Sequence, residues 1–152
     1  MIKLKHIVLS CAVLLCGFGP GVACAALGEP EASVTADVAQ LKGSIKVTDR
    51  SGYRVHEIQL SSGTEVREFV RPDGKVFAIA WKGPTIPNLR QILGQYFDNY
   101  VTAAKAKHQG HTRLQIQQSD LMVQSGGHMR AFSGRAYLPQ DVPGGVSVGD
   151  LH

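Results

Sequence analysis

The chain has 152 residues, of which 43% are hydrophobic and 18% charged, and its formal net charge is +4. This length fits one domain, and the balance of apolar and charged residues excludes a wholly disordered chain. Because the sequence contains no run of Lys or Arg, we expect no nucleic-acid partner.

Residues 1–25 have the layout of a secretory signal peptide. Two lysines precede an apolar stretch over residues 7–18, and small side chains lead up to Ala25. This stretch is shorter than the roughly 20 residues that span a bilayer. We therefore expect export to the periplasm or the medium, cleavage after Ala25, and no membrane contact afterwards. Two alternatives stay open: an uncleaved membrane anchor, and a lipoprotein signal in which Cys24 is modified.

All three cysteines, Cys11, Cys16 and Cys24, lie in this leader. Its removal would leave a protein without thiols, which excludes disulfides and thiolate catalysis. The loss of two leader lysines would leave 14 basic side chains of the original 16 against 12 acidic ones, a net charge of +2. We predict that residues 26–138 form one domain and that residues 139–152 form an extended, partly mobile tail.

The segment 26–52 has mixed composition, and its residues 34–41 are compatible with a short helix or a strand. Three strands are then predicted, at residues 53–60, 64–71 and 75–81. Ser61-Ser62-Gly63 forms the first turn between them. The second is Arg71-Pro72-Asp73-Gly74, where Gly74 suits the left-handed position. Strands joined by tight turns predict an antiparallel meander.

The third strand, "KVFAIAW", is apolar on both faces, which is typical of a covered, central strand. Strict alternation places Phe77, Ile79 and Trp81 on one face. The other face then carries the smaller side chains Val76, Ala78 and Ala80. Pairing of Phe69 with Phe77 would build an aromatic layer that includes Tyr53 and Val55, and we interpret this layer as core.

Apolar residues next recur at three- and four-residue steps from Ile86 to Ala104, which predicts one long amphipathic helix. Gly94 inside it indicates close packing against the sheet. Two further strands are predicted at residues 113–123 and 129–138, with a turn at Ser125-Gly126-Gly127. The predicted fold is α+β: an antiparallel sheet of about five strands, in the order β-β-β-α-β-β, with the helix on one face. The other face needs the N-terminal segment, the tail or a partner to cover it.

The hairpin register places His56 opposite Glu68 and Glu57 opposite Arg67. A histidine beside a carboxylate could act as an oriented general base. Ordinary cross-strand pairing explains the same pattern. Since nothing marks a nucleophile or an oxyanion site, we predict no catalytic residue.

His108 and His111 have the spacing at which two imidazoles on a helix can share a metal ion. Gly110 separates them, and no acidic residue is near in the sequence. We interpret them as solvated loop residues and predict neither a metal nor a cofactor. The glycine pairs at 126–127 and 144–145 lack the spacing of a phosphate loop.

Several segments stand in a recognisable order: "REF", "DGKVFAIAW", "GP" and "PNLRQILGQYF", followed by "GGHMRAFSGRAYLPQDVPGGVSVGDL". In this order they resemble the family known as domain of unknown function 2844, over nearly the whole chain after the leader. The resemblance implies a small exported protein of a Gram-negative bacterium. It implies no catalytic residue, because the family has no assigned activity.

These observations favour an exported, non-enzymatic domain that binds a protein or another component of the cell envelope. The alternative is a small exported enzyme that uses His56 with Glu68 or Glu57. A metal carrier that uses His108 and His111 is the third hypothesis.

Overall fold

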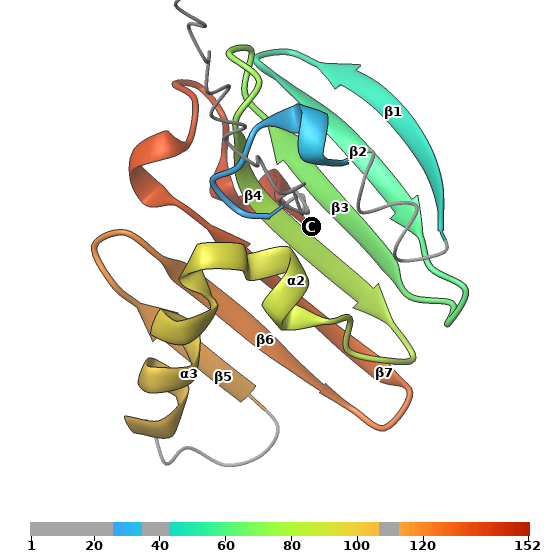
Figure 1. Ribbon diagram of the computed structural model, residues 1–152, viewed down its shortest axis with the longest axis vertical. Helices are drawn as coiled ribbons and strands as arrows, with labels where there is room; N and C mark the ends of the chain where they lie inside the picture. The colour runs from blue at the N-terminus through green and yellow to red at the C-terminus, as the bar shows by residue number, and fades with distance from the viewer. Residues whose placement is uncertain (1–25, 35–42, 107–112) are drawn as a thin grey trace, which may run out of the picture.

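The computed structural model describes residues 26–34, 43–106 and 113–152, and every structural statement below concerns these residues. They form one antiparallel sheet of seven strands in the spatial order β1-β2-β3-β4-β7-β6-β5 (Figure 1). The strands are β1 (Ser44–Arg50), β2 (Tyr53–Gln59), β3 (Glu65–Val70), β4 (Val76–Gly83), β5 (Arg113–Gln117), β6 (Met122–His128) and β7 (Ala131–Tyr137). The helical segments are η1 (Glu31–Ser33), α2 (Leu89–Leu93), η2 (Gly94–Tyr96), α3 (Phe97–Ala106), η3 (Pro139–Asp141) and η4 (Val148–Asp150).

The topology places β4 in the middle of the sheet. Strands β1 to β4 form a meander, and the segment α2-η2-α3 then carries the chain towards the far edge. From that edge, β5, β6 and β7 return as a second meander, and β7 pairs with β4. No described helix has the length and apolar character that a membrane span requires.

The predicted α+β architecture of about five strands, β-β-β-α-β-β, is wrong. The described chain is mostly β, with seven strands in the order β-β-β-β-α-β-β-β. The single long helix is also interrupted, because the 3-10 turn η2 separates α2 from α3. The missed strand β1 lies at an edge of the sheet, and six of its seven residues are exposed. Its apolar residues Ile45 and Val47 do alternate with polar ones, as in a strand, but the alternation is short and both side chains are exposed.

The region after the helix contains three strands, β5, β6 and β7, where two were predicted. Residues 113–123 contain β5, a turn closed by the hydrogen bond from Gln118 N to Leu121 O (2.9 Å), and the start of β6. The turn predicted at residues 125–127 lies inside β6, and the chain reverses instead at Met129 and Arg130, where φ of Arg130 is 65°. A Cβ on Gly127 would lie 2.2 Å from Ala131 O, so this glycine permits a close approach of two strands.

Three of the four strands of the first meander were predicted correctly. Strands β2, β3 and β4 lie within a residue or two of the expected ranges. The register pairs His56 with Glu68 and Glu57 with Arg67, as the sequence indicated. Gly74 has φ of 83°, which confirms the left-handed position predicted for it.

The predicted side-chain pattern of β4 is wrong at its start, because the strand contains an irregularity there. Phe69 pairs with Ala78 and Val70 pairs with Val76, so Phe77 has no partner residue in β3. An extra residue of this kind is a β-bulge, and it shifts the alternation of side chains by one position.

The bulge divides the large side chains of β4 between both faces of the sheet. Phe77 packs with Tyr53 and Phe69, with ring centroids 6.2 and 6.3 Å from its own. Ile79 and Trp81 belong to a separate core cluster on the opposite face. The predicted aromatic layer therefore exists, but Ile79 and Trp81 are not part of it.

The helices and the N-terminal segment cover one face, which we call the helix face; they lie on the viewer's side of the sheet in Figure 1. Leu27 N donates to Ile92 O (3.0 Å) and Gly28 N donates to Val76 O (2.8 Å), which fixes the segment to both α2 and β4. Gly94 does mark a close approach, but its neighbour is Ala26 of this segment: a Cβ on Gly94 would lie 2.3 Å from the Ala26 Cβ.

Residues 139–152 cover part of the opposite face, which we call the tail face. Leu151 is fully buried in the cluster that contains Phe69 and Phe77. Asp141 ties the start of this segment to the β3–β4 turn through Arg71 (3.0 Å) and Lys75 (2.7 Å). The hydrogen bond to Asp141 raises the pKa of Lys75. The partial mobility predicted for the tail stays a prediction.

The contact between Trp81 on β4 and Gly134 on β7 can be tested by mutation. Gly134 pairs with Trp81, and a Cβ on Gly134 would lie 2.3 Å from Cζ2 of the indole. We expect Gly134→Ala to lower the free energy of unfolding by about 1–3 kcal/mol, because the ring or the strand must shift. Urea unfolding followed by tryptophan fluorescence measures this change.

Gly144→Ala is the matched control, because a Cβ on Gly144 would meet nothing within 4 Å. This variant should unfold within about 0.5 kcal/mol of the parent. Equal stability of the two variants would contradict the contact between Trp81 and Gly134.

Candidate functional site

The structure brings one of the two predicted histidine–carboxylate pairs together and separates the other. His56 and Glu68 are paired on β2 and β3, and both side chains are buried on the helix face. Glu57 points to the tail face, where its carboxylate lies 3.6 Å from both Lys46 Nζ and Arg67 Nε. Glu57 is therefore not a partner of His56.

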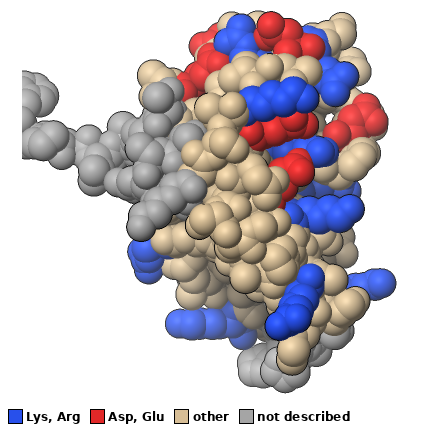
Figure 2. All heavy atoms as spheres, turned by 90° about the vertical axis from the view of Figure 1, so that its right-hand side faces the viewer, with Lys and Arg blue, Asp and Glu red and all other residues tan. Residues whose placement is uncertain are grey.

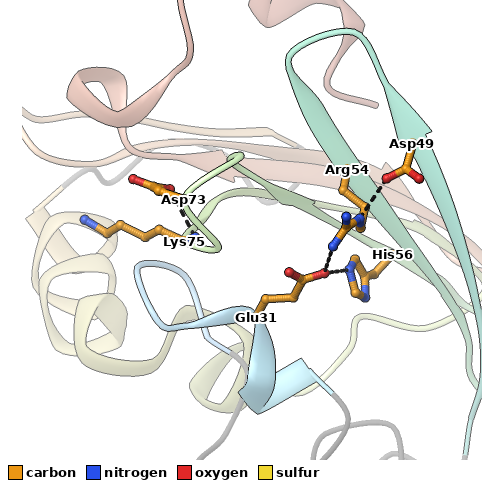
Figure 3. A network of polar contacts seen from close by, with 6 residues as sticks. All are labelled: Glu31, Asp49, Arg54, His56, Asp73 and Lys75. Carbon is orange, nitrogen blue, oxygen red and sulfur yellow. Dashed lines mark hydrogen bonds and ion pairs between the residues drawn. The ribbon is translucent and has the colours of Figure 1, made fainter.

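The nearest polar partner of His56 was missed at the sequence level. Glu31 Oε1, from η1, lies 2.8 Å from His56 Nε2 and 2.8 Å from Arg54 Nη1 (Figure 3). Arg54 Nε also donates to Asp49 Oδ1 at 2.8 Å. The contact joins residues 25 positions apart, in a segment whose structure the sequence left open, so no local signal could have revealed it.

These contacts shift the titration of the two charged groups. Burial alone would raise the pKa of Glu31, but the hydrogen bonds and charges of Arg54 and His56 together lower that pKa. The hydrogen bonds to Asp49 and to Glu31 raise the pKa of Arg54. Glu31 is therefore a stable carboxylate that holds the N-terminal segment against β2.

The chemistry of a general base requires access to a substrate, and the His56 cluster shows none. His56 is 6% exposed and Glu68 is 0% exposed. Neither of the two hollows described below is lined by His56, Glu31 or Glu68. The cluster has the position of a clamp between the N-terminal segment and the sheet.

The tail face, by contrast, contains a hollow of about 950 Å³ beside the end of the tail. We call it the basic hollow. Its lining residues include four cationic side chains, Arg67, Lys82, Arg113 and Arg135, and one carboxylate, Glu65.

The register explains how these residues meet. One cross-strand row contains Arg67, Ala80, Arg135, Gln124 and Gln115 in spatial order. The next row on the same face contains Glu65, Lys82, Ser133, Gly126 and Arg113. Since paired residues, and residues two apart on one strand, share a face, both rows point to the same side of the sheet.

Small side chains create the space. The floor of the basic hollow is formed by Ala80, Ser133 and Gly126 on the strands β4, β7 and β6. Their short side chains do not fill the space above the sheet. Leu151 and His152 bound it on the side of the tail. Ala80 itself is buried in the cluster that contains Leu151, so the tail covers the floor on this side.

Two of the arginines are held in fixed positions. Arg135 donates through Nε to Gln124 Oε1 (2.9 Å) and through Nη1 to Val148 O (2.7 Å). Arg67 donates through Nε to Glu65 Oε1 and through Nη1 to His152 O (2.6 Å). A guanidinium anchored along one edge keeps further donors in a planar, rigid fork that suits a carboxylate or phosphate.

The charge of the basic hollow is only partly compensated. Arg67 is near Glu65 and Glu57, but Lys82 and Arg113 form no ion pair with any residue of the described chain. Figure 2 looks at the edge formed by β1. Acidic side chains lie in its upper part together with basic ones, and the charged side chains visible in its lower part are basic.

A second hollow of about 290 Å³ lies on the other side of the tail's end. Arg67 and His152 line both hollows, so the end of the tail forms the wall between them. The second hollow contains Asp150 and Glu57 as well as Arg50, and its charges are thus of both signs.

The comparisons with known proteins can be set beside this geometry. The family model described as Protein of unknown function (DUF2844) matches residues 23–151. The chain belongs to this family. No curated protein and no solved structure matches it significantly. The match confirms the family that the sequence resembled, and it brings no activity to this DUF2844 chain.

The described part of this DUF2844 chain contains no group of three His, Cys, Asp or Glu side chains that could hold a metal ion. His108 and His111 lie outside the described residues, so the prediction that they bind no metal stays untested. His152 Nδ1 contacts Gly149 O at 2.9 Å.

The clamp at Glu31 predicts an acid-dependent loss of stability. A carboxylate whose pKa is lowered in the folded state contributes stability above its unfolded pKa, about 4.3, and this contribution is lost as the pH falls through the folded pKa. We expect Glu31→Gln to be less stable than the parent at pH 7 by about 1 kcal/mol, because the ion pairs are partly exposed. The difference should disappear near pH 3.

Urea midpoints between pH 7 and pH 3 measure this effect. Glu29→Gln is the matched control, since the Glu29 side chain makes no hydrogen bond or ion pair with the described residues. A Glu31→Gln curve that stays parallel to the parent curve at every pH would contradict the clamp.

Proposed function

We propose that this DUF2844 chain is an exported, non-enzymatic binding domain whose binding surface is the basic hollow on the tail face. The observation that carries the proposal is the basic hollow itself: about 950 Å³ with four cations, two of which, Lys82 and Arg113, form no ion pair with the described residues, although Glu65 lies opposite Lys82 on β3. Among the described lining residues one carboxylate, Glu65, stands against four cations, so an anionic partner would compensate the remaining positive charge.

The lining supports binding rather than catalysis. It contains amide, hydroxyl and guanidinium groups but no cysteine, and its one histidine, His152, contacts a backbone oxygen. Among the described residues of this face, no serine lies at hydrogen-bond distance from a base, as acyl transfer requires. The enzyme alternative at His56 has no support from the geometry, because that histidine lies under the N-terminal segment.

The location belongs to the same proposal. The lysine-flanked apolar stretch in residues 1–25 supports export, and the periplasm or the medium is the compartment we propose. We also propose a component of the cell envelope as the partner. Fractionation of cells that express the full chain, followed by mass measurement of the exported form, tests cleavage after Ala25.

A site-specific crosslink tests the binding surface. A photo-reactive amino acid at Ser133, on the floor of the basic hollow, should give one discrete crosslinked species in intact cells. The same group at Thr102, an exposed residue of α3 on the helix face, should not. Combining Ser133 labelling with Arg135→Gln should remove the species, because this change deletes a fixed cation.

Two outcomes would contradict the proposal. One is recovery of uncrosslinked monomer alone from the Ser133 position. The other is a species of equal yield from Ser133 and Thr102, since that would report a random neighbour.

A further inference from the structure

We infer that the basic hollow binds an extended acidic peptide segment of a partner protein, laid across the strands. This inference rests on the proposed function and specifies its ligand. It starts from the placement of the four cations, because each comes from a different strand: Arg67 from β3, Lys82 from β4, Arg135 from β7 and Arg113 from β5.

The strand order gives the distance that these four cations span across the sheet. From β3 to β5 the sheet order is β3-β4-β7-β6-β5, which is four steps between neighbouring strands. At about 4.8 Å per step, the cations span about 19 Å. A single small anion reaches one or two of them, whereas an extended ligand with several anionic groups reaches all four.

An extended peptide matches this span. Six residues in extended conformation cover about 20 Å, and alternate side chains point to one side at intervals of about 7 Å. Three carboxylates of such a segment would then face the line of cations. The fixed guanidinium forks of Arg67 and Arg135 suit carboxylates, and the amides of Gln59 and Gln124 suit peptide groups.

The floor disfavours two other polyanions. Single-stranded nucleic acid is held by a basic groove together with aromatic rings on which its bases stack. Among the described lining residues the single aromatic one, Trp81, is only 3% exposed and packs into the helix face. An acidic polysaccharide would likewise find no ring surface under its sugars.

The experiment measures binding of a fluorescein-labelled hexaglutamate peptide to the purified chain by fluorescence anisotropy at low and at physiological salt. We expect saturable binding that weakens with salt, and no binding of hexaglutamine. The double variant Lys82→Gln/Arg113→Gln should bind at least tenfold more weakly. Both side chains are exposed and form no ion pair with the described residues, so the fold should tolerate the change.

Lys105→Gln is the matched control, because Lys105 is an exposed cation of α3 on the helix face. This variant carries one charge less than the parent and should bind hexaglutamate as the parent does. Equal weakening by Lys105→Gln and by each single change, Lys82→Gln or Arg113→Gln, would show that only net charge matters, which overturns the inference.

One further ligand and the crosslink at Ser133 separate the inference from the proposed function. Tighter binding of an oligogalacturonate of six units than of hexaglutamate would overturn the peptide assignment while leaving the basic hollow as a binding surface. Failure of hexaglutamate to bind, together with a discrete crosslink from Ser133, would overturn the acidic ligand but not the binding function. Failure of both experiments would remove both proposals.

Discussion

Burial of both faces of β4 is the constraint on which the rest of the structure depends. Its first six residues, Val76 to Trp81, are all buried, and the strand lies between β3 and β7 in the middle of the sheet. The bulge at Phe77 allows this one strand to place large side chains on both faces. Each face therefore needs a cover, which the helices and the N-terminal segment supply on one side and the tail on the other.

The two covers are unequal, and the basic hollow follows from that difference. On the helix face, Glu31 and Leu27 fix the N-terminal segment over β2 and α2. On the tail face, Leu151 fills the space beside Phe77, but the small side chains beyond Ala80 meet no covering layer. Long cationic side chains surround this uncovered part. Burial of apolar side chains explains the part of the tail face around Phe77 and Leu151. It does not explain the cationic part beyond Ala80.

The sequence could predict what depends on local pattern. Turn residues around Gly74 and the alternation in β2 and β3 were enough for strands β2 to β4 and for the pairing of His56 with Glu68. A β-bulge shifts the alternation of side chains without changing the composition of the strand. The face of the sheet on which Phe77 lies could therefore not be predicted from the sequence pattern. Strand β1 shows only a short alternation, at Ile45 and Val47, and neither side chain is buried. The position of Glu31 depends on tertiary contacts across a segment of mixed composition.

The basic hollow shows most clearly why a charge pattern in the sequence is an incomplete guide to a surface. Arg67, Lys82, Arg113 and Arg135 are far apart in the sequence, and no run of Lys or Arg marks them. Only the order β3-β4-β7-β6-β5 brings them into line. Because Arg67 also donates to His152 O, the cation at one end of that line holds the tail in place. A carboxylate bound to the remaining donors of Arg67 would therefore lie beside the end of the tail, because one guanidinium serves both the tail and the basic hollow.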